Sequence, residues 1–358
     1  MRSGWHGSRV KAVFHSTLAA LAVASFAQVA HAQQPDQGKN SAVFMYRGAD
    51  RDPRLIQKAR EEGTVVWYTS MAQTESIPLT KAFEAKYGVK VELWRASSDK
   101  LRQRVITEAQ GKRFTADVLE ATSPEMESMA REKLLSAFHS PHVADLPADI
   151  IPPHREWVPS RLNILVVAYN TNKVKREDLP TTYEGFLDPK WKGMIALESG
   201  DFDWMAAMIN AMGTEKGTAF FRRLGEMRPE LRKGHTLLAE LVSAGEVPVG
   251  LTVYNSNAES MKRRGGPIDW MPVQPVVANP QGLALTKNAP HPHAALLFMD
   301  YMLSPEGQEL LNSMGRIPAS SKVQSKLKNF PITTIKPAIV LDESDKWLKV
   351  WDEFFVKK

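Results

Sequence analysis

Strand and helix patterns alternate along this chain, and this alternation most constrains its fold. The apolar run 64–68 precedes a helical pattern that ends near Gly88, and a second strand pattern follows at 89–94. A helical pattern over 99–110 then leads to a third strand pattern at 116–120. Repeated β-α-β units predict a mostly parallel sheet that is covered by helices. The sequence therefore predicts an α/β fold.

A second series of the same patterns begins in the middle of the chain. The run 164–169 is typical of a buried strand, and a strand pattern at 194–197 leads to a helical pattern at 204–212. Further strand patterns occupy 247–253 and 282–285. A chain of 358 residues is long enough for two domains of roughly 100–200 residues each. We therefore expect two α/β units.

The chain contains no cysteine. This absence excludes a lipid anchor on an N-terminal cysteine, a disulfide framework, a thiolate nucleophile and a zinc–sulfur site. A protein without such links must rely on a large apolar core, and its hydrophobic content of 43% is sufficient for one.

The first 32 residues have the three-part layout of a cleaved secretory signal peptide. A basic start precedes the uncharged apolar run 17–27, and Ala30-His31-Ala32 then forms a small-residue cleavage site. The run is shorter than the about 20 residues that span a bilayer, so a retained membrane anchor is the weaker alternative. Cleavage would leave Gln33 as the mature N-terminus of a periplasmic protein without membrane insertion.

The segment after the cleavage site, 33–52, is predicted to be a flexible leader, because its start is polar and poor in apolar residues. Loss of Arg2, Arg9 and Lys11 with the signal peptide reduces the formal net charge from +6 to +3. The remaining basic residues are scattered along the chain. We therefore expect no nucleic-acid partner.

The segment 288–308 carries the most specific pattern of the chain. Pro292 suits the first turn of a helix, and an apolar stripe follows it at helical spacing. Ser304 and Pro305 suit the start of a second helix. The segment resembles the C-terminal part of the extracellular solute-binding proteins of ABC importers, of the ferric-iron/thiamine/phosphonate-like type (family 1, type II periplasmic binding proteins).

Four further motifs extend this resemblance over most of the mature chain. They occur in the order found in that family, and they are the segments E-G-T-V-V-W-Y-T-S at 62–70, L-D-P-K-W-K-G at 187–193, G-E-V-P-V-G at 245–250 and G-R-I-P at 315–318.

The resemblance implies an α/β fold of two lobes with a ligand cleft between them. The chain is expected to cross between the lobes twice, near 159–167 and near 271–284. These crossings assign residues 53–160 and 278–358 to the first lobe, and residues 161–277 to the second lobe.

The same resemblance implies a function in transport. A monomer would capture a small solute by lobe closure and deliver it to an inner-membrane ABC permease with its ATPase. Iron(III) or an iron complex, a phosphonate and a phosphorylated sugar are the solutes that the family suggests, and no cofactor is implied. The alternatives are a secreted enzyme on the same fold and a ligand-presenting partner of a membrane sensor. The chain lacks the common nucleophile-elbow, zinc-protease and nucleotide-binding motifs, which argues against an enzyme.

Three predicted strand-to-helix turns are candidate ligand contacts, because open α/β sheets bind ligands beyond the carboxyl ends of their strands. Free backbone amides at helix N-termini also favour anions there. Helix capping by the same side chains is the structural alternative. The candidates are Thr69 and Ser70, Thr122 and Ser123, and Ser199, Gly200 and Asp201.

Asp203 and Trp204 follow the third of these turns. Together with Asp201 they would suit a cationic or hydroxyl-bearing ligand, since carboxylates and an aromatic face both stabilise cations. The alternative is that one of the aspartates caps the helix and that Trp204 packs in the core.

Tyr254 is the one candidate metal ligand that the resemblance supplies. Ferric-binding relatives carry two adjacent tyrosines at this place, whereas Asn255 follows Tyr254 here. They also carry a histidine in the first loop, where this chain has only Thr69-Ser70-Met71-Ala72-Gln73. The family's glutamate after the third strand falls near Thr122, with Glu120 and Glu125 close by. The constellation is a poor match to iron(III), so the metal, if any, stays open.

His291 and His293 resemble a metal-binding pair in spacing. They lie in a proline-rich turn at a predicted helix start, far from the expected cleft. We therefore interpret both as surface residues without a metal.

Overall fold

The structure is a computed structural model that describes residues 38–357. The predicted signal peptide at 1–32 lies outside the described residues, as does the first part of the predicted leader.

The strands confirm the predicted α/β class. In the first half of the sequence, β1 pairs in parallel with β2 and β3. In the second half, β6 pairs in parallel with β7 and β8. The sheet order is β2-β1-β3-β10-β5-β8-β6-β7. The strands are β1 (Thr64–Thr69), β2 (Lys90–Arg95), β3 (Val118–Thr122), β4 (Leu135–Ser136), β5 (Val158–Asn170), β6 (Ile195–Glu198), β7 (Glu230–Arg232), β8 (Val249–Tyr254), β9 (Ile268–Met271), β10 (Val277–Thr286), β11 (Ile317–Pro318) and β12 (Thr333–Thr334).

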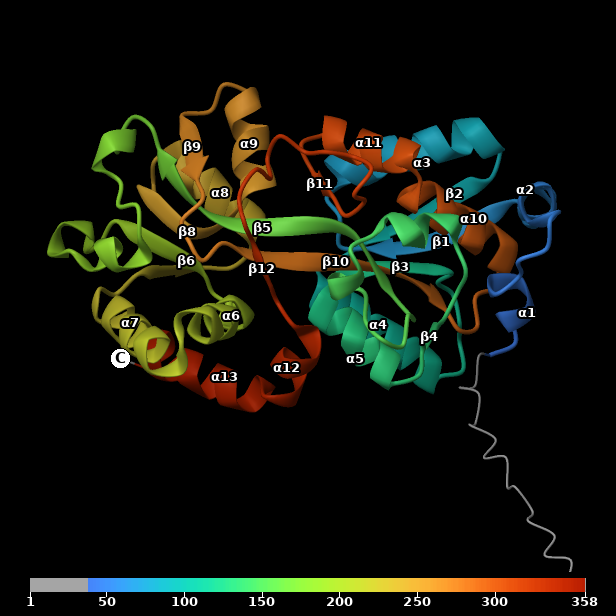
Figure 1. Cartoon of the computed structure of the whole chain (residues 1–358), viewed down its shortest axis with the longest axis horizontal. Coiled ribbons are helices and arrows are strands. Elements are labelled where there is room, and N and C mark those ends of the chain that lie inside the picture. The colour runs from blue at the N-terminus through green and yellow to red at the C-terminus, as the bar shows by residue number, and fades with distance from the viewer. Residues whose placement is uncertain (1–37, 358) are drawn as a thin grey trace, which may run out of the picture. The chain divides into compact units, whose positions relative to one another are not determined.

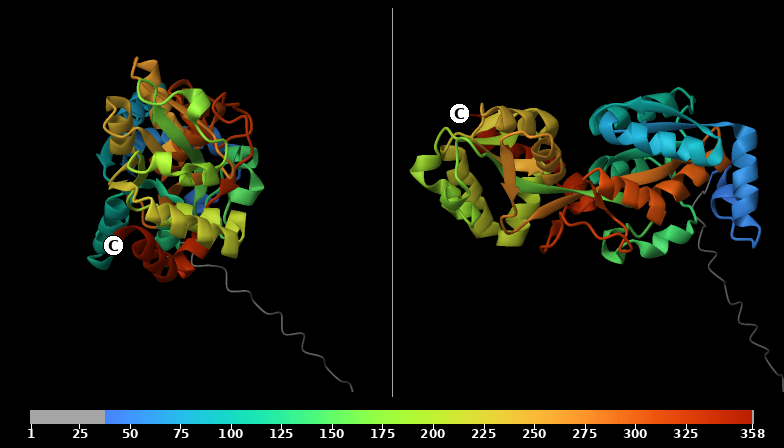
Figure 2. Two further views of the ribbon diagram at one scale, coloured as in Figure 1. Left: turned by 90° about the vertical axis from the view of Figure 1, so that its left-hand side faces the viewer. Right: turned by 90° about the horizontal axis from the view of Figure 1, so that it is seen from above.

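Two fully buried strands, β5 and β10, connect the two halves (Figures 1 and 2). The first part of β5 pairs with β10, and its second part pairs with β8 and β9. β10 in turn pairs with β3. All of these crossing pairs are antiparallel, whereas the strands inside each β-α-β unit, and the short pair of β10 with β12, are parallel. β5 and β10 therefore lie at the two crossings predicted near 159–167 and 271–284, and the C-terminal segment makes a further passage to the second lobe.

We use "first lobe" for β1–β4 with the helices packed on them, and "second lobe" for β6–β9 with theirs. The boundaries predicted for the lobes, after residues 160 and 277, stay a prediction. The first-lobe helices are α1 (Ser41–Phe44), α2 (Arg51–Glu62), α3 (Gln73–Tyr87), α4 (Ser98–Gln110), α5 (Ser123–Arg131), α10 (Pro292–Leu303) and α11 (Pro305–Ser313). Those of the second lobe are α6 (Phe202–Met212), α7 (Thr214–Glu226), α8 (His235–Ala244) and α9 (Asn255–Arg263).

Glycines end the helices that precede β1 and β2. Gly63 after α2 and Gly88 after α3 have φ values of +75° and +73°, a left-handed conformation that glycine adopts at little cost. The two turns deliver the chain into β1 and β2, which bring Thr69 to the carboxyl edge of the sheet.

The C-terminal segment differs from its predicted place in the first lobe. β12 pairs with β10, and α12 (Pro337–Asp342) contacts α5 of the first lobe. However, α13 (Ser344–Trp351) and the π-helical turn Asp352–Val356 pack on α6 and α7 of the second lobe. The reason is apolar burial, because Trp347, Trp351 and Phe354 belong to the second-lobe core.

The described part of the predicted leader is also packed. Residues 38–52 contain α1 and the start of α2, and the side chain of Phe44 is fully buried. The Asn40 side chain donates a hydrogen bond to the carbonyl of Ala289 at 2.9 Å. Phe44 and Asn40 therefore both anchor a segment whose composition predicted flexibility.

Candidate functional site

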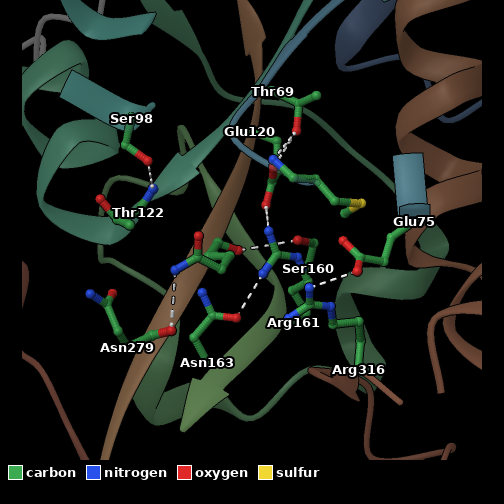
Figure 3. A network of polar contacts seen from close by, with 12 residues as sticks. Thr69, Glu75, Ser98, Glu120, Thr122, Ser160, Arg161, Asn163, Asn279 and Arg316 are labelled. Carbon is green, nitrogen blue, oxygen red and sulfur yellow. Dashed lines mark hydrogen bonds and ion pairs between the residues drawn. The ribbon is translucent and has the colours of Figure 1, made fainter. Parts of the chain in front are cut away.

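A buried polar network lies at the carboxyl edge of the first-lobe sheet (Figure 3). Nη2 of Arg161 lies 2.8 Å from Oε1 of Glu120, and Nη1 of Arg161 donates to Oδ1 of Asn163 at 2.8 Å. The Thr69 hydroxyl donates to the second oxygen of Glu120 and accepts the backbone amide of Met71 at 2.9 Å. Thr69 is fully buried and its hydroxyl is occupied, so it positions the network.

The N-terminus of α5 presents the next predicted residues. The Thr122 hydroxyl donates to the carboxylate of Glu125, and the Thr122 amide donates to Oγ of Ser98 at 3.2 Å. Ser123 is buried and donates to Oδ1 of Asn279 at 3.3 Å. Ser70 is partly exposed, and its amide donates to the Glu120 carbonyl at 2.9 Å. Thr122 and Ser123 therefore anchor this turn, although the Thr122 side chain makes no capping hydrogen bond to the helix backbone.

The turn after β6 places the second-lobe candidates. Glu198, the last residue of β6, accepts the amide of Gly200 at 2.5 Å with Oε2 and the amide of Gly234 at 2.8 Å with Oε1. The Ser199 amide donates to the carbonyl of Arg232 at 3.0 Å. The turn is thereby folded around the Glu198 carboxylate, and it points Asp201 inward.

Asp201 and His235 meet at the centre of the site. Oδ1 of Asp201 lies 3.3 Å from Nε2 of His235, and the two side chains are 6% and 18% exposed. Oδ2 of Asp201 is buried and has no hydrogen-bond partner. The other ring nitrogen of His235, Nδ1, lies 3.0 Å from the carbonyl of Thr252. The Tyr254 ring stacks on His235 with centroids 3.8 Å apart, which fixes the plane of the imidazole.

Burial and like charge together shape the electrostatics of the site. Burial, then the charge of Asp201, raises the pKa of Asp203 to about 7, and the same two causes raise the pKa of Glu198. Burial lowers the pKa of His235, but Asp201 and Glu198 outweigh this effect and raise it to about 9. Burial and the charges of Asp201 and Asp203 hold the pKa of Tyr254 well above its usual range. Three carboxylates outnumber the single histidine, so the site carries an excess of buried negative charge.

Trp204 does not belong to the site. Its side chain is fully buried in the second-lobe core, with ring centroids 5.2 Å from Phe221 and 6.0 Å from Tyr183. Oδ1 of Asp203 accepts the amide of Trp204 at 2.7 Å, whereas Asp201 makes no capping hydrogen bond. The structure therefore supports the structural alternative for Trp204, while the charge of Asp203 remains part of the site.

Sequence reasoning missed Glu198, His235 and Asn279. Glu198 directly precedes the predicted turn, and His235 begins α8 immediately after β7, so both satisfy the same strand-to-helix rule. Asn279 lies inside a crossing strand, where no local pattern marks it. Its Nδ2 donates to Oδ2 of Asp203 at 3.2 Å.

His291 and His293 contact carboxylates separately. Nδ1 of His291 lies 2.9 Å from Oδ2 of Asp117, and Nδ1 of His293 lies 2.6 Å from Oε1 of Glu62. Both rings are partly buried at the start of α10. Each histidine therefore ties α10 to a different part of the first lobe.

One group of side chains has the composition of a metal-binding site. Glu198, Asp201 and His235 each offer one ligand atom, and these atoms all lie within 4.8 Å of one another. Tyr254 stacks on this group, whereas Thr69 and Glu120 belong to the separate network on the first lobe.

Comparison with known proteins decides the family. The model of the bacterial extracellular solute-binding protein family matches residues 68–309. The chain belongs to this family. Members bind small ligands and deliver them to ABC permeases, so this solute-binding protein acts in transport and not as an enzyme. The family is extracellular or periplasmic. Among the described residues, none of the helices combines the length and apolar character needed to cross a bilayer.

Proteins with similar sequences include two that are named for iron. This solute-binding protein is 26% identical to iron uptake protein A1 of Synechocystis sp., over 74% of this chain and 78% of that protein. It is 24% identical to the major ferric iron-binding protein of Neisseria meningitidis serogroup B, over 75% and 85%.

Solved structures share its type II fold of two lobes around a ligand cleft. Iron-bound HitA from Pseudomonas aeruginosa matches with a TM-score of 0.70 and 23% identity, covering 81% of this chain and 99% of that one. AfuA from Actinobacillus pleuropneumoniae with fructose-6-phosphate bound matches with a TM-score of 0.71 and 22% identity, covering 83% and 100%. The fold therefore does not determine the solute.

Proposed function

We propose that this solute-binding protein captures a small, positively charged solute between its lobes. The observation that carries the proposal is the cluster of Glu198, Asp201 and Asp203 beside His235 and Tyr254. Oδ2 of Asp201 is buried without a partner, which leaves an acceptor for a ligand. Among residues 38–357, none of these three carboxylates forms an ion pair with a lysine or arginine. A cation would satisfy this buried charge.

The first lobe adds charge from the opposite side. The carboxylate of Glu125, at the start of α5, acts electrostatically on Asp203, at the start of α6. The two helices belong to different lobes and are linked through Ser123 and Asn279. Closing the lobes on a cation would bring these carboxylates together with less repulsion, which couples capture to closure.

A negatively charged solute fits the same cluster poorly. A phosphate or phosphonate group would have to approach several carboxylates at once, and like charges that are buried together repel strongly. The basic side chains Arg161 and Arg316 lie nearby, but they are already bonded to Glu120 and Glu75. Buried acidic charge therefore favours a cationic solute over a sugar phosphate.

The finer features of transport belong to the same proposal. The protein is exported, is cleaved before Gln33 and acts as a monomer that docks on its own permease. Intact mass measurement of the periplasmic protein tests the cleavage site, and light scattering tests the monomer.

A thermal-shift panel with matched cations and anions tests the proposal. MnCl₂, putrescine and spermidine form the cationic arm, and inorganic phosphate and fructose 6-phosphate form the anionic arm. A bound solute at 100 times its Kd stabilises the folded protein by about 2.7 kcal/mol. We expect stabilisation in the cationic arm that Asp203→Asn weakens. Stabilisation by the anions alone would overturn the proposal.

A further inference from the structure

We propose that Glu198, Asp201 and His235 form a coordination site for a divalent first-row transition-metal ion, and that this ion is the captured cation. The inference rests on the proposed function and names the class of its solute. The three residues come from two adjacent strand-to-helix turns, after β6 and after β7. Parallel pairing of β6 with β7 brings these turns side by side.

The distances between the ligand atoms suit one ion. The three ligand atoms lie within 4.8 Å of one another. Zinc–nitrogen and zinc–oxygen bonds of about 2.0–2.2 Å at the tetrahedral angle place two ligand atoms about 3.3–3.6 Å apart. The ligand atoms therefore have to approach one another by up to about 1.5 Å to complete the coordination, a movement within the reach of side-chain rotation.

The donor set and its charge identify the class of ion. Imidazole nitrogen suits zinc, iron, nickel and copper, whereas carboxylate oxygen also suits manganese. Two carboxylates carry the charge that neutralises a divalent ion, and the ion would displace the proton of the His235 ring when it binds. The set contains no sulfur and only one nitrogen, so it favours Zn²⁺ or Mn²⁺ over a soft ion such as Cu⁺.

Two of the three candidate ligands are oriented by a second group, as in known metal sites. The carbonyl of Thr252 lies 3.0 Å from Nδ1 of His235, which directs Nε2 toward Asp201. The amides of Gly200 and Gly234 hold the two oxygens of Glu198. These partners would fix the first coordination shell before the ion arrives.

One ligand atom is available without breaking any contact. Oδ2 of Asp201 has no hydrogen-bond partner, although the residue is only 4% exposed. An orphaned carboxylate oxygen is costly to bury, and a bound cation removes that cost. Three protein ligands leave further positions on the ion open, so either a hydrated ion or a metal chelate fits.

The test is calorimetric titration of chelator-treated protein with ZnCl₂ and, separately, with MnCl₂. We expect one ion per chain. His235→Gln and Asp201→Asn should each weaken metal binding by at least about 10-fold. Loss of a group that only orients a metal ligand already weakens binding by about 10–100-fold, and loss of a ligand should weaken it at least as much. The matched control is His154→Gln. His154 lies away from the cluster, and its Nε2 is 3.0 Å from Oε2 of Glu127. This control should bind the ion like the wild type.

A spectroscopic arm separates ligation from a structural effect. Loading with Co²⁺ should produce visible ligand-field bands that His235→Gln alters, while circular dichroism in chelator shows that each variant is folded. Repeating the titration with metal–citrate complexes distinguishes a free ion from a chelate. If the wild type binds no metal, or if all cluster variants bind it unchanged, the inference is overturned.

The putrescine and spermidine arm keeps the two proposals distinguishable. Stabilisation by these organic cations without any metal binding overturns the metal site and leaves the proposed function standing. The absence of both effects overturns both proposals.

Discussion

The side-chain amide of Asn279 donates a hydrogen bond to Asp203, with Nδ2 lying 3.2 Å from Oδ2. Asn279 belongs to the crossing strand β10, and Asp203 belongs to the first turn of α6 in the second lobe. Oδ1 of the same Asn279 side chain accepts a hydrogen bond from the Ser123 hydroxyl of the first lobe at 3.3 Å. One asparagine therefore connects both lobes at the edge of the acidic cluster.

Replacing this asparagine should destabilise the protein. Asn279→Ala leaves the Ser123 hydroxyl and one Asp203 oxygen without partners, and an unsatisfied buried polar group costs about 1–3 kcal/mol. Urea unfolding measures the change. Ser123→Ala serves as the control, because it removes only one bond and should cost less. If Asn279→Ala is as stable as the wild type, the hydrogen bonds of Asn279 between the lobes do not contribute to the free energy of unfolding.

The buried ion pair of Arg161 and Glu120 supports a second prediction. Their side chains are 4% and 0% exposed. Arg161→Met removes the counter-charge and leaves a buried carboxylate, which costs about 3–5 kcal/mol. The free energy of unfolding in urea measures this loss. Lys58→Met breaks the exposed pair with Glu61 and should change stability little. An equal loss of unfolding free energy in the two variants would contradict the role of Arg161 as the counter-charge of buried Glu120.

Local sequence rules predicted the fold and part of the site. Strand-to-helix turns are local features, so the position of Asp201 followed from an apolar run and its turn residues, whereas Tyr254 came from the family resemblance. The crossings followed from the resemblance to the solute-binding family and not from a local pattern, since β10 contains Asn279, Pro280 and Gln281.

Long-range packing decided what the sequence did not predict. The hydroxyl of Thr69 is occupied because the register of β1 and β3 places it opposite Glu120. His235 reaches Asp201 only because β6 and β7 pair in parallel. The place of Trp351 on the second lobe depends on contacts with α6 and α7, far away in the sequence. No turn or periodicity rule reports such contacts.

The corrected place of Trp204 can be tested directly. Because the ring is fully buried among Tyr183 and Phe221, Trp204→Ala should destabilise the protein by about 3–5 kcal/mol. Trp204→Phe keeps an aromatic ring in the core and should leave solute affinity unchanged. Urea unfolding and calorimetric titration with MnCl₂ measure the two effects. A loss of affinity in stably folded Trp204→Phe would restore Trp204 to the site.

The stacking of Tyr254 on His235 separates two roles for the tyrosine. Tyr254→Phe retains the ring that orients the imidazole and removes the hydroxyl. We expect metal affinity close to that of the wild type, because the proposed ligands are Glu198, Asp201 and His235. Tyr254→Ala removes the stack and should weaken binding, since His235 loses its orientation. If Tyr254→Phe weakens binding as much as Tyr254→Ala, the hydroxyl is itself a ligand.

The buried hydroxyl of Tyr68 should make stability depend on pH in the alkaline range. It donates to Oε1 of Glu108 at 3.0 Å, and burial followed by this contact raises the pKa of Tyr68 to about 12. An unfolded tyrosine has a pKa of about 10. Below that pH both states keep the proton and the contribution is fully present.

Between about pH 10 and pH 12 the unfolded state loses its proton first, so this contribution to stability falls as the pH rises. Urea unfolding of the wild type and of Tyr68→Phe at matched pH values from about 8 to 11 measures the effect. The difference between the two proteins should be constant up to about pH 9 and should then decrease. The same slope in both proteins would show that the Tyr68 proton is not held more tightly in the folded state.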